Sequence, residues 1–517
     1  MSRSTAQPAP VIRRKTRLGS YAVMYLLFAA FLVCTHLWIA HLPYFWDEAG
    51  QFVPAALDLF HSGSWIPRST LPNIHPPAVM AYLAFVWRIA GYSPESTRLA
   101  MLALAAFGVL AAFLLAIELT RETRGAPAFL AAALLCLSPL YYAQSMMAQL
   151  DAPAMLFSTL ALLFFLQGHI RLSVGACVAL VLVKETGVIV PVVLGVWLAR
   201  ERRWRDAAWF AAPLVILAGW IAILLRQTGH WAGNTDFVQY NVRYPLHPVR
   251  LVVTFVRRVY FLAIANFHWV GTAAVLYAWR KTRIFRSRPW QVAATLTRAH
   301  VILFTILGGA VLNRYLLPVV PIVLAAMAAA ISSLPRAAKV AAAMVFIGGI
   351  TASNFINPPY PFPFEENLAF TDFVRLHAEA ADYVAHWYLD PVVHTAWPLS
   401  LELSRPELGF VPRQIRVEML PNLTTSTLDS LDWTKVQILM VFSRNWDPPL
   451  NLMRLAPLRT LWQSYYDFVP NVTPEEARAR VPFPLDQTFT RGGQWVEIYV
   501  NPDLPRIPHQ HLKVAAR

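Results

Sequence analysis

The sequence predicts a polytopic α-helical membrane protein that ends in a smaller α/β domain. Hydrophobic residues make up 57% of the 517 residues and charged residues only 14%, whereas about a quarter of the residues in soluble globular proteins are charged. Apolar segments recur from residue 19 to residue 356 and then become sparse. Short basic runs separate them, as the positive-inside rule expects of cytoplasmic loops. Lipid is therefore the expected solvent for most of the chain.

About eleven segments are apolar enough to be membrane-spanning helices, although several are shorter than the roughly 20 residues that a perpendicular helix needs. The expected spans are 19–41, 94–119, 126–147, 152–168, 171–184, 186–199, 207–226, 251–279, 292–311, 315–333 and 338–356. The first exceeds a signal-peptide core and ends in His41-Leu-Pro, so we expect a retained anchor.

Charge sets the expected topology. Residues 1–18 are a basic tail that we place in the cytoplasm. An odd number of spans then puts every basic run, including those at 13–17, 121–124 and 280–288, on the cytoplasmic side and residues 357–517 outside. The net charge of +15 is thus explained by topology, and no nucleic-acid partner is expected. The expected location is the cell membrane, in a bacterium the inner membrane, with membrane lipids as surroundings.

Residues 357–517 read as a folded extracytoplasmic unit. The segment begins with a proline-rich turn and continues into an expected helix at 366–387. Apolar, β-branched runs then alternate with helical patterns. The expected strands are 391–396, 436–442 and 494–500, and the expected helices are 451–464 and 474–480.

Several enzyme classes lose their main support. The three cysteines, Cys34, Cys136 and Cys177, lie inside apolar segments, so no disulfide framework is expected. The sequence has no Cys-x-x-Cys set, P-loop, Gly-x-Gly-x-x-Gly, His-Glu-x-x-His or Gly-x-Ser-x-Gly. Metalloprotease, ATPase and serine-hydrolase activities are therefore not indicated.

The first exported loop carries an acidic pair, Asp47 and Glu48, directly after the first span. A carboxylate in a partly desolvated cavity can accept a proton from an attacking hydroxyl, as glycosyl transfer requires. An N-cap for the following helix would also explain the aspartate.

Two further residues, one in this loop and one just after it, could carry chemistry. His75, ahead of Pro76-Pro77, could meet a phosphate or a metal, but a structural turn at a helix start explains it as well. Arg98 begins the second span, where a cation must either snorkel to the surface or face the bundle interior.

Charged residues also interrupt later apolar segments. Asp151 opens an apolar helix, either as an N-cap or as part of a polar cavity. Lys184 and Glu185 break a long apolar run, which predicts a helical hairpin with its tip near the exported face. The pair is structural, binding, or both.

Arg314 and Tyr315 form another polar break between short apolar helices. Arginine can hold a phosphate bidentately and offset charge on a departing phosphate oxygen, although both residues also suit an interfacial belt. The loop at 229–241 mixes aromatic rings with amides and includes Asn234 and Tyr240, which suits sugar binding and membrane interfaces equally.

The order of these features over residues 19–335 resembles the polytopic glycosyltransferases of the GT-C superfamily, especially bacterial relatives of protein O-mannosyltransferases and lipid A aminoarabinose transferases. The segments that carry the resemblance are Asp47-Glu48, His75-Pro76-Pro77, Ser93-Pro-Glu-Ser-Thr-Arg-Leu, Ser138-Pro-Leu-Tyr-Tyr-Ala, Gln149-Leu-Asp151-Ala-Pro, Lys184-Glu-Thr-Gly and Arg314-Tyr-Leu-Leu-Pro-Val-Val-Pro. The resemblance implies a GT-C-like transmembrane catalytic domain over 19–356.

The resemblance also implies roles. Asp47 would be the catalytic base of an inverting transfer from a polyprenyl-phosphate sugar, with Glu48 as its neighbour. Arg314, with Lys184 or Arg98, would bind the donor phosphate. The residues expected to line the substrate cavity are His75, Asp151, Glu185, Tyr315, Asn234 and Tyr240.

The resemblance indicates the cofactor and the acceptor less directly than the catalytic roles. The aminoarabinose transferases have Glu-Lys-Pro-Pro where this chain has Ile74-His75-Pro-Pro, so one carboxylate that can ligate a metal is missing. We expect no metal and no other cofactor. The acceptor could be a glycan, a lipid or a protein, since all are reached from the same face.

Two other functions fit the same features. A lipid-linked glycan transporter or flippase also needs a polar cavity with cations but no base. A third hypothesis treats residues 357–517 as a binding module and the membrane part as its scaffold.

Overall fold

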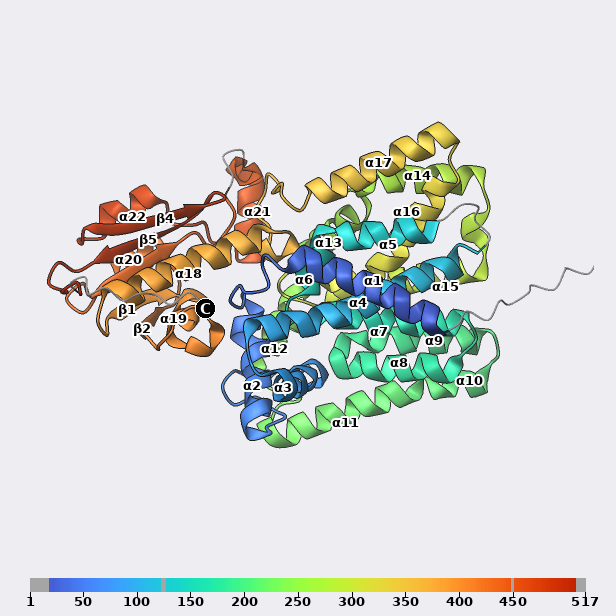
Figure 1. Ribbon diagram of the computed structural model, residues 1–517, viewed down its shortest axis with the longest axis horizontal. Helices are drawn as coiled ribbons and strands as arrows, with labels where there is room; N and C mark the ends of the chain where they lie inside the picture. The colour runs from blue at the N-terminus through green and yellow to red at the C-terminus, as the bar shows by residue number, and fades with distance from the viewer. Residues whose placement is uncertain (1–17, 122–126, 448–450, 508–517) are drawn as a thin grey trace, which may run out of the picture.

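The computed structural model describes residues 18–121, 127–447 and 451–507. A bundle of apolar helices makes up one end of the molecule, and a region containing a five-stranded sheet makes up the other (Figure 1). The larger helices of the bundle are α1 Leu18–His36, α4 Pro94–Leu119, α5 Pro127–Leu137, α6 Pro139–Ser145, α7 Asp151–Leu166, α8 Ile170–Val183, α9 Ile189–Arg200, α10 Trp204–Trp209, α11 Ala211–Thr228, α13 Pro248–Ala263, α14 His268–Lys281, α15 Arg288–Ile306, α16 Val320–Ser332 and α17 Arg336–Ala352.

Further helical elements connect these helices. They are η1 Glu48–Phe52, α2 Val53–Ser62, α3 Ala78–Ala90, η2 Glu185–Val188, α12 Thr235–Val238, η3 Gln239–Arg243, η4 Tyr244–Leu246, η5 Ile284–Arg286, η6 Asn313–Val319 and η7 Phe364–Glu366. Of these, α2, α3 and α12 lie at the end of the bundle that faces the sheet (Figure 1). The element η5 lies at the opposite end, between α14 and α15.

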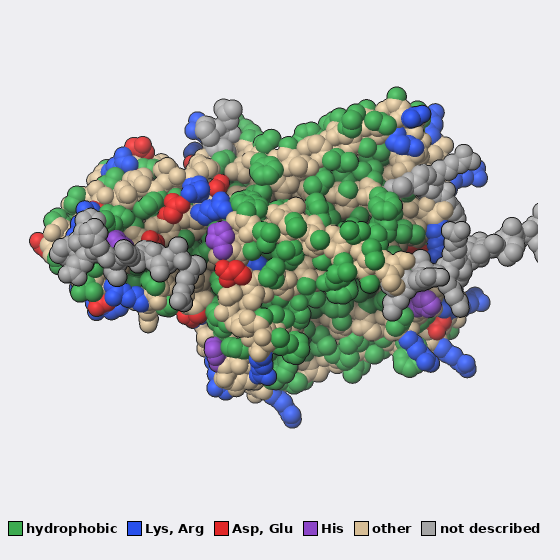
Figure 2. All heavy atoms as spheres, viewed as in Figure 1, with side chains coloured by type: hydrophobic (Ala, Val, Ile, Leu, Met, Phe, Trp, Pro, Cys, Tyr) green, Lys and Arg blue, Asp and Glu red, His purple; other side chains and the backbone are tan. Residues whose placement is uncertain are grey.

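The surface is that of a multi-pass membrane protein. Hydrophobic side chains cover the flank of the bundle, whereas Lys and Arg side chains gather at the end remote from the sheet (Figure 2). Four described helical segments are long and apolar enough to span a bilayer: Gly19–His36, Pro94–Leu119, Trp204–Thr228 and Asn313–Ser332. Two bent helix pairs raise this number to six. The count of eleven spans and the orientation stay predictions, and the basic run at 13–17 lies outside the described residues.

Two expected spans are not single straight helices. The segment 126–147 bends by 66° between α5 and α6, where Pro139 cannot donate to the helical hydrogen-bond ladder. The segment 251–279 bends by 85° between α13 and α14. Asn266 and Phe267 have φ angles of 51° and 65° there, so the backbone leaves the right-handed helical region.

The C-terminal region is built on a mixed sheet with strand order β2-β1-β3-β5-β4. The strands are β1 Val392–Ala396, β2 Arg416–Leu420, β3 Ile438–Phe442, β4 Leu485–Arg491 and β5 Gln494–Val500. The helices of the region are α18 Ala369–Trp387, α19 Leu399–Ser404, η8 Pro406–Leu408, α20 Thr425–Asp429, η9 Leu452–Arg454, α21 Ala456–Tyr466 and α22 Pro474–Arg480. β1 pairs in parallel with β2 and β3, while β5 pairs antiparallel with β3 and β4.

Three of the five strands, β1, β3 and β5, coincide with the expected ones, and β2 and β4 were not expected. Both missed strands lie at sheet edges, where β2 interrupts its apolar residues with Arg416 and Glu418 and β4 is mostly polar, so neither has the continuous apolar run that marks the inner strands. The β4–β5 hairpin turns at Gly492 and Gly493, whose φ angles of 55° and 80° suit glycine.

The bundle and the C-terminal region share one hydrophobic core. Phe45, which follows α1, packs edge-on against Phe373 of α18 with ring centroids 5.6 Å apart, and it also contacts Phe370. The boundary near residue 356 therefore separates two architectures but not two cores. This continuity allows both parts to contribute to one site.

A candidate active site between the helices and the C-terminal region

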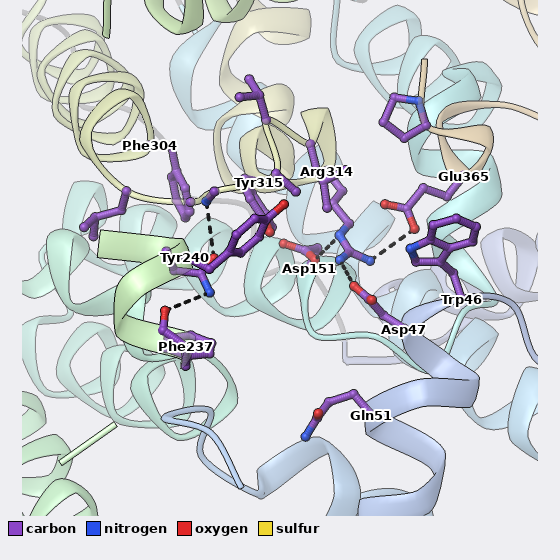
Figure 3. A pocket seen from close by; sticks show the side chains of 18 of the residues that line it. Trp46, Asp47, Gln51, Asp151, Phe237, Tyr240, Phe304, Arg314, Tyr315 and Glu365 are labelled. Carbon is purple, nitrogen blue, oxygen red and sulfur yellow. Dashed lines mark hydrogen bonds and ion pairs between the residues drawn. The ribbon is translucent and has the colours of Figure 1, made fainter. Parts of the chain in front are cut away.

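A cavity of about 860 Å³ lies where the helical bundle meets the C-terminal region. Its walls come from the loop after α1, residues 73–75, the starts of α7 and η2, the 231–242 loop, Arg257 of α13, residues 304–315, and four segments of the C-terminal region. Polar and aromatic side chains converge on it (Figure 3). The lining includes Trp46, Asp47, His75, Asp151, Lys184, Glu185, Tyr240, Arg257, Arg314, Tyr315, Glu365, Trp397 and Arg444.

Arg314 is the centre of the polar network. One terminal nitrogen, Nη2, donates to Oδ2 of Asp47, and the other, Nη1, donates to the side-chain oxygen of Gln149 and to Oε2 of Glu365 at 3.2 Å. Oδ2 of Asp151 lies 3.5 Å from Nε. Arg314 is only 4% exposed, so its charge is shared by three carboxylates in a desolvated setting.

The three carboxylates differ in their access to the cavity. The side chain of Asp47 is 35% exposed, whereas those of Asp151 and Glu365 are 5% and 4% exposed. Burial, opposed by the nearby Arg314, raises the pKa of Glu365 to about 7. Asp47 is therefore the member of this group that a bound molecule can reach.

The turn at Trp46 directs Asp47 into the cavity. Trp46 has φ of 47°, a left-handed conformation that bulky residues rarely adopt. Its ring packs edge-on against Trp397 at 4.6 Å and against Phe373 at 5.9 Å, both from the C-terminal region. Packing by the C-terminal region thus holds the backbone that presents Asp47.

A second ion pair adjoins the first. Nζ of Lys184 donates to Oδ1 of Asp151 at 2.6 Å and lies 4.4 Å from the ring centroid of Tyr315. Asp151 thus links Lys184 to Arg314. The break between α8 and η2, which the charged pair at 184–185 predicts, places Lys184 at the cavity wall.

His75 and Glu185 form a third pair, in which Nδ1 of His75 lies 2.7 Å from Oε2 of Glu185. The His75 ring also packs edge-on against Phe237 at 5.5 Å. Within the described residues, no group of three or more His, Cys, Asp or Glu side chains is arranged to hold a metal ion. The expectation that the protein needs no metal stays a prediction.

The structure brings most of the expected site residues together. Those that line the cavity are Asp47, His75, Asp151, Lys184, Glu185, Tyr240, Arg314 and Tyr315. Glu48, Arg98 and Asn234 do not line it. The three that lie elsewhere have other partners.

Glu48 and Arg98 form an ion pair in which both side chains are fully buried. Glu48 also accepts from the backbone N–H groups of Phe45 and Ala148, and Arg98 also donates to the carbonyl oxygens of Pro43 and Met146. Arg98 thus neither snorkels to the surface nor reaches the cavity. The pair ties the loop after α1 to α4 and to the segment before α7.

Asn234 caps α12. Its side-chain oxygen accepts from the N–H of Phe237 at 2.7 Å, and its amide donates to the carbonyl of Pro72 at 2.6 Å. Both ends of the side chain are therefore engaged by backbone groups. Phe237 and Tyr240, on the same loop, do line the cavity.

Sequence patterns missed four residues of the cavity, Arg257, Glu365, Trp397 and Arg444, and included Gln149 only as part of a segment that carries the resemblance. Glu365 follows the proline-rich turn that marks the boundary at residue 357, and an acidic pair there was the available signal. Arg257 lies inside a segment expected to be one span, which hid its place at the cavity wall. The others come from contacts between segments far apart in sequence.

Comparisons with known proteins agree with this architecture. Residues 74–228 match the family model for dolichyl-phosphate-mannose-protein mannosyltransferase. Among solved structures, ArnT from Cupriavidus metallidurans bound to undecaprenyl phosphate matches with a TM-score of 0.55 and 15% identity, covering 94% of this chain and 99% of that one. The apo state of the same ArnT matches with a TM-score of 0.54 and 14% identity, covering 93% and 98%. No curated protein sequence matches significantly.

The ArnT match extends over nearly the whole of both chains, including the C-terminal region. At 15% identity it establishes the fold. Because the family model independently matches the segment that contains His75, Asp151, Lys184 and Glu185, the resemblance of this chain to the GT-C superfamily glycosyltransferases is confirmed.

Proposed function

We propose that this protein transfers a sugar from a polyprenyl-phosphate donor to an acceptor hydroxyl, with inversion, and that Asp47 is the base. The observation that carries the proposal is the difference in access among the three carboxylates around Arg314. Asp47 is 35% exposed and the other two are nearly fully buried. The fold shared with ArnT, which has been solved with undecaprenyl phosphate, supports this type of donor.

In the proposed reaction, Asp47 takes the proton of the acceptor hydroxyl through Oδ1 while Oδ2 stays bonded to Arg314. The hydroxyl oxygen forms a bond to the anomeric carbon as the bond from that carbon to the phosphate oxygen breaks. The electron pair leaves with polyprenyl phosphate, and attack from the opposite side inverts the anomeric centre. The products are the glycosylated acceptor, polyprenyl phosphate and protonated Asp47.

The departing phosphate needs a cation that is not already neutralised. Arg314 is engaged by three carboxylates and Lys184 by Asp151, so both are poor candidates for primary phosphate ligands. Arg257 and Arg444 line the same cavity, and neither forms an ion pair in the described parts of the chain, although the charge of Arg257 acts on Glu366. We assign the phosphate to these two guanidinium groups, which can bind its oxygens bidentately.

The remaining walls suit a sugar and an acceptor. Trp231, Phe237 and Tyr240 line the same cavity as Asp47 and offer aromatic faces for a sugar ring. The C-terminal region supplies Trp462 and Tyr466 at the same cavity, which puts it in reach of the acceptor. The volume of about 860 Å³ is within the usual range for ligand cavities. Whether the acceptor is a glycan, a lipid or a protein is left to the assay.

The test measures release of polyprenyl phosphate from a panel of labelled polyprenyl-phosphate sugars by the detergent-purified protein, with envelope extract as acceptor. We expect release by the wild type and loss of at least about 100-fold in Asp47→Asn, which cannot accept the proton. Asp206→Asn is the matched control, because Asp206 lies on the surface of α10 in an exposed pair with Arg203. Equal release by wild type and Asp47→Asn would show that Asp47 is not the catalytic base.

Absence of release from every donor by folded wild-type protein would overturn the transferase proposal. The purified protein would then be placed in liposomes to measure passage of lipid-linked glycan, since transport needs the cavity but no base. Transport by wild type and Asp47→Asn alike would favour a flippase.

A further inference from the structure

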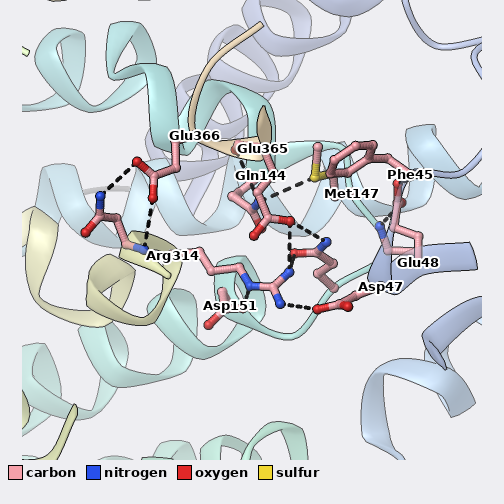
Figure 4. Close-up of polar contacts among 12 residues, drawn as sticks. Phe45, Asp47, Glu48, Gln144, Met147, Asp151, Arg314, Glu365 and Glu366 are labelled. Carbon is pink, nitrogen blue, oxygen red and sulfur yellow. Dashed lines mark hydrogen bonds and ion pairs between the residues drawn. The ribbon is translucent and has the colours of Figure 1, made fainter. Parts of the chain in front are cut away.

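Two adjacent carboxylates near the start of the C-terminal region accept hydrogen bonds from two adjacent residues of η6. Glu366 accepts from the side-chain amide of Asn313 at 2.8 Å and from its backbone N–H at 3.2 Å. Glu365 accepts from Nη1 of Arg314 at 3.2 Å. Glu365 and Glu366 lie on the same side of the Arg314 side chain (Figure 4). Neighbouring residues of η7 thus hold neighbouring residues of η6.

Gln149 also binds Arg314 and links it to Glu365. Its amide nitrogen donates to Oε2 of Glu365 at 3.4 Å, and its oxygen accepts from the same Nη1 that Glu365 binds. With Nη1 held in this way, the planar guanidinium places its other terminal nitrogen, Nη2, at Oδ2 of Asp47. Figure 4 shows Glu365 and Asp47 at opposite ends of the guanidinium.

We propose that Glu365 is a positioning residue that sets both the orientation and the basicity of Asp47 through Arg314. The inference rests on the proposed function, because it concerns the base of that reaction. It makes the C-terminal region a direct contributor to proton transfer as well as a cavity wall. Glu365 touches Arg314 and Gln149, and its effect on the reaction passes through Arg314.

The physical basis is competition for one positive charge. When Glu365 is ionised, its negative charge partly offsets the positive charge of Arg314. Arg314 then stabilises the ionised form of Asp47 less, so Asp47 binds a proton more readily. When Glu365 is neutral, Arg314 stabilises ionised Asp47 more strongly and makes it a weaker base. The groups that face Glu365 are Arg314, Gln149, Asp47 and Asp151, and Gln144 approaches its backbone carbonyl at 3.5 Å. The pKa of about 7 for Glu365 means that both charge states are accessible near neutral pH.

The test compares kcat, KM and the pH profile of kcat/KM for wild type, Glu365→Gln and Glu365→Asp in the donor-release assay. Glu365→Gln keeps the shape and an acceptor oxygen but loses the charge. We expect kcat to fall roughly 10- to 100-fold with little change in KM, and the acid limb of the profile to move to lower pH. Glu365→Asp restores the charge and should return the acid limb toward the wild-type position.

Glu366→Gln is the matched control, because it keeps an acceptor for Asn313 and lies one residue from Glu365 in the same turn. It should affect kcat much less than Glu365→Gln. An equal fall in both variants would mean that the turn is only structural, which would overturn the inference.

The outcomes separate the two proposals. An inactive wild type overturns the proposed function and this inference with it. An active wild type whose Glu365→Gln variant keeps the same kcat and acid limb overturns the inference alone. If Glu365→Gln does not elute as a folded species from size exclusion, Glu365→Asp decides: a change in kcat with the wild-type acid limb supports the inference, and unchanged kcat overturns it.

Discussion

The guanidinium of Arg314 donates to Oδ2 of Asp47, a residue 267 positions earlier in the chain. This contact joins η6 to the loop after α1 and leaves Oδ1 of Asp47 for a substrate. Arg314 can do so because the C-terminal region, through Glu365, and the segment before α7, through Gln149, hold its other terminal nitrogen. The candidate base is therefore positioned by three parts of the chain that are remote in sequence.

Arg314→Lys should separate charge from geometry at this contact. A lysine keeps the positive charge but has one nitrogen and no planar fork, so it cannot hold Gln149, Glu365 and Asp47 in the observed arrangement. We expect kcat in the donor-release assay to fall about 100-fold, because the base is misplaced. Arg298→Lys on an exposed face of α15 is the control. Wild-type kcat in Arg314→Lys would show that charge alone is sufficient.

Arg257→Gln and Arg444→Gln test where the donor phosphate binds. Each removes a guanidinium that lines the cavity and forms no ion pair in the described parts of the chain, although the charge of Arg257 acts on Glu366. Because a hydrogen bond to a charged group contributes about 1.5 to 3 kcal/mol, we expect each change to weaken inhibition by polyprenyl phosphate roughly tenfold or more. The salt dependence of inhibition should also decrease.

Arg298→Gln serves as the control for these two variants. Unchanged inhibition in both cavity variants would show that the phosphate does not bind Arg257 and Arg444. Arg314 and Lys184, which the family resemblance implies as ligands, would then be the candidates. Inhibition constants measured at two salt concentrations are sufficient to distinguish the alternatives.

How much of the site could be predicted depended on the type of signal. Charged residues that interrupt apolar segments, such as Asp151, Lys184 and Arg314, were found because a charge in a bilayer is costly and so is rarely accidental. The same logic selected Arg98, yet its buried charge is neutralised by Glu48 in an ion pair away from the cavity. A costly charge indicates that a partner exists, but the sequence does not tell whether that partner is structural or a ligand.

The fold followed a similar pattern. Apolar length gave the positions of the bundle helices, and β-branched runs gave the three inner strands of the sheet. The 85° bend between α13 and α14 was missed because both halves are apolar enough to read as one span. Glu365 and Trp397 were missed because they enter the site only when the C-terminal region packs on the loop after α1. Such contacts are determined by tertiary packing and have no local pattern.

Glu48→Gln should destabilise the protein. Glu48 and Arg98 are both fully buried, so removal of one charge leaves the other without its counterion. We expect a loss of about 3 kcal/mol in the free energy of unfolding and a lower Tm in detergent. The double variant Glu48→Gln/Arg98→Met should lose less than the sum of the single variants, because it leaves no unpaired charge. Additive losses would show that the two side chains act independently.

The control for this cycle is the exposed pair of Arg203 and Asp206 on α10. Exposed pairs contribute about 1 kcal/mol or less, so Asp206→Asn should leave Tm nearly unchanged. A comparable fall in both cases would indicate a general sensitivity of the detergent-solubilised protein to charge.

Glu365 makes the folded protein less stable as pH rises toward and through 7. Burial, opposed by Arg314, raises the pKa of its carboxyl from 4.5 to about 7 in the folded protein. Between these values the folded state keeps a proton that the unfolded state has released. The stabilisation is therefore fully present below the unfolded pKa and is lost as pH rises through about 7. Since glutamine cannot titrate, we expect the Tm of wild type minus that of Glu365→Gln to decrease between about pH 5 and pH 8. Thermal scans in detergent at constant ionic strength measure the two Tm values. If the Tm difference does not change with pH, Glu365 stays ionised throughout and Arg314 fully neutralises its charge.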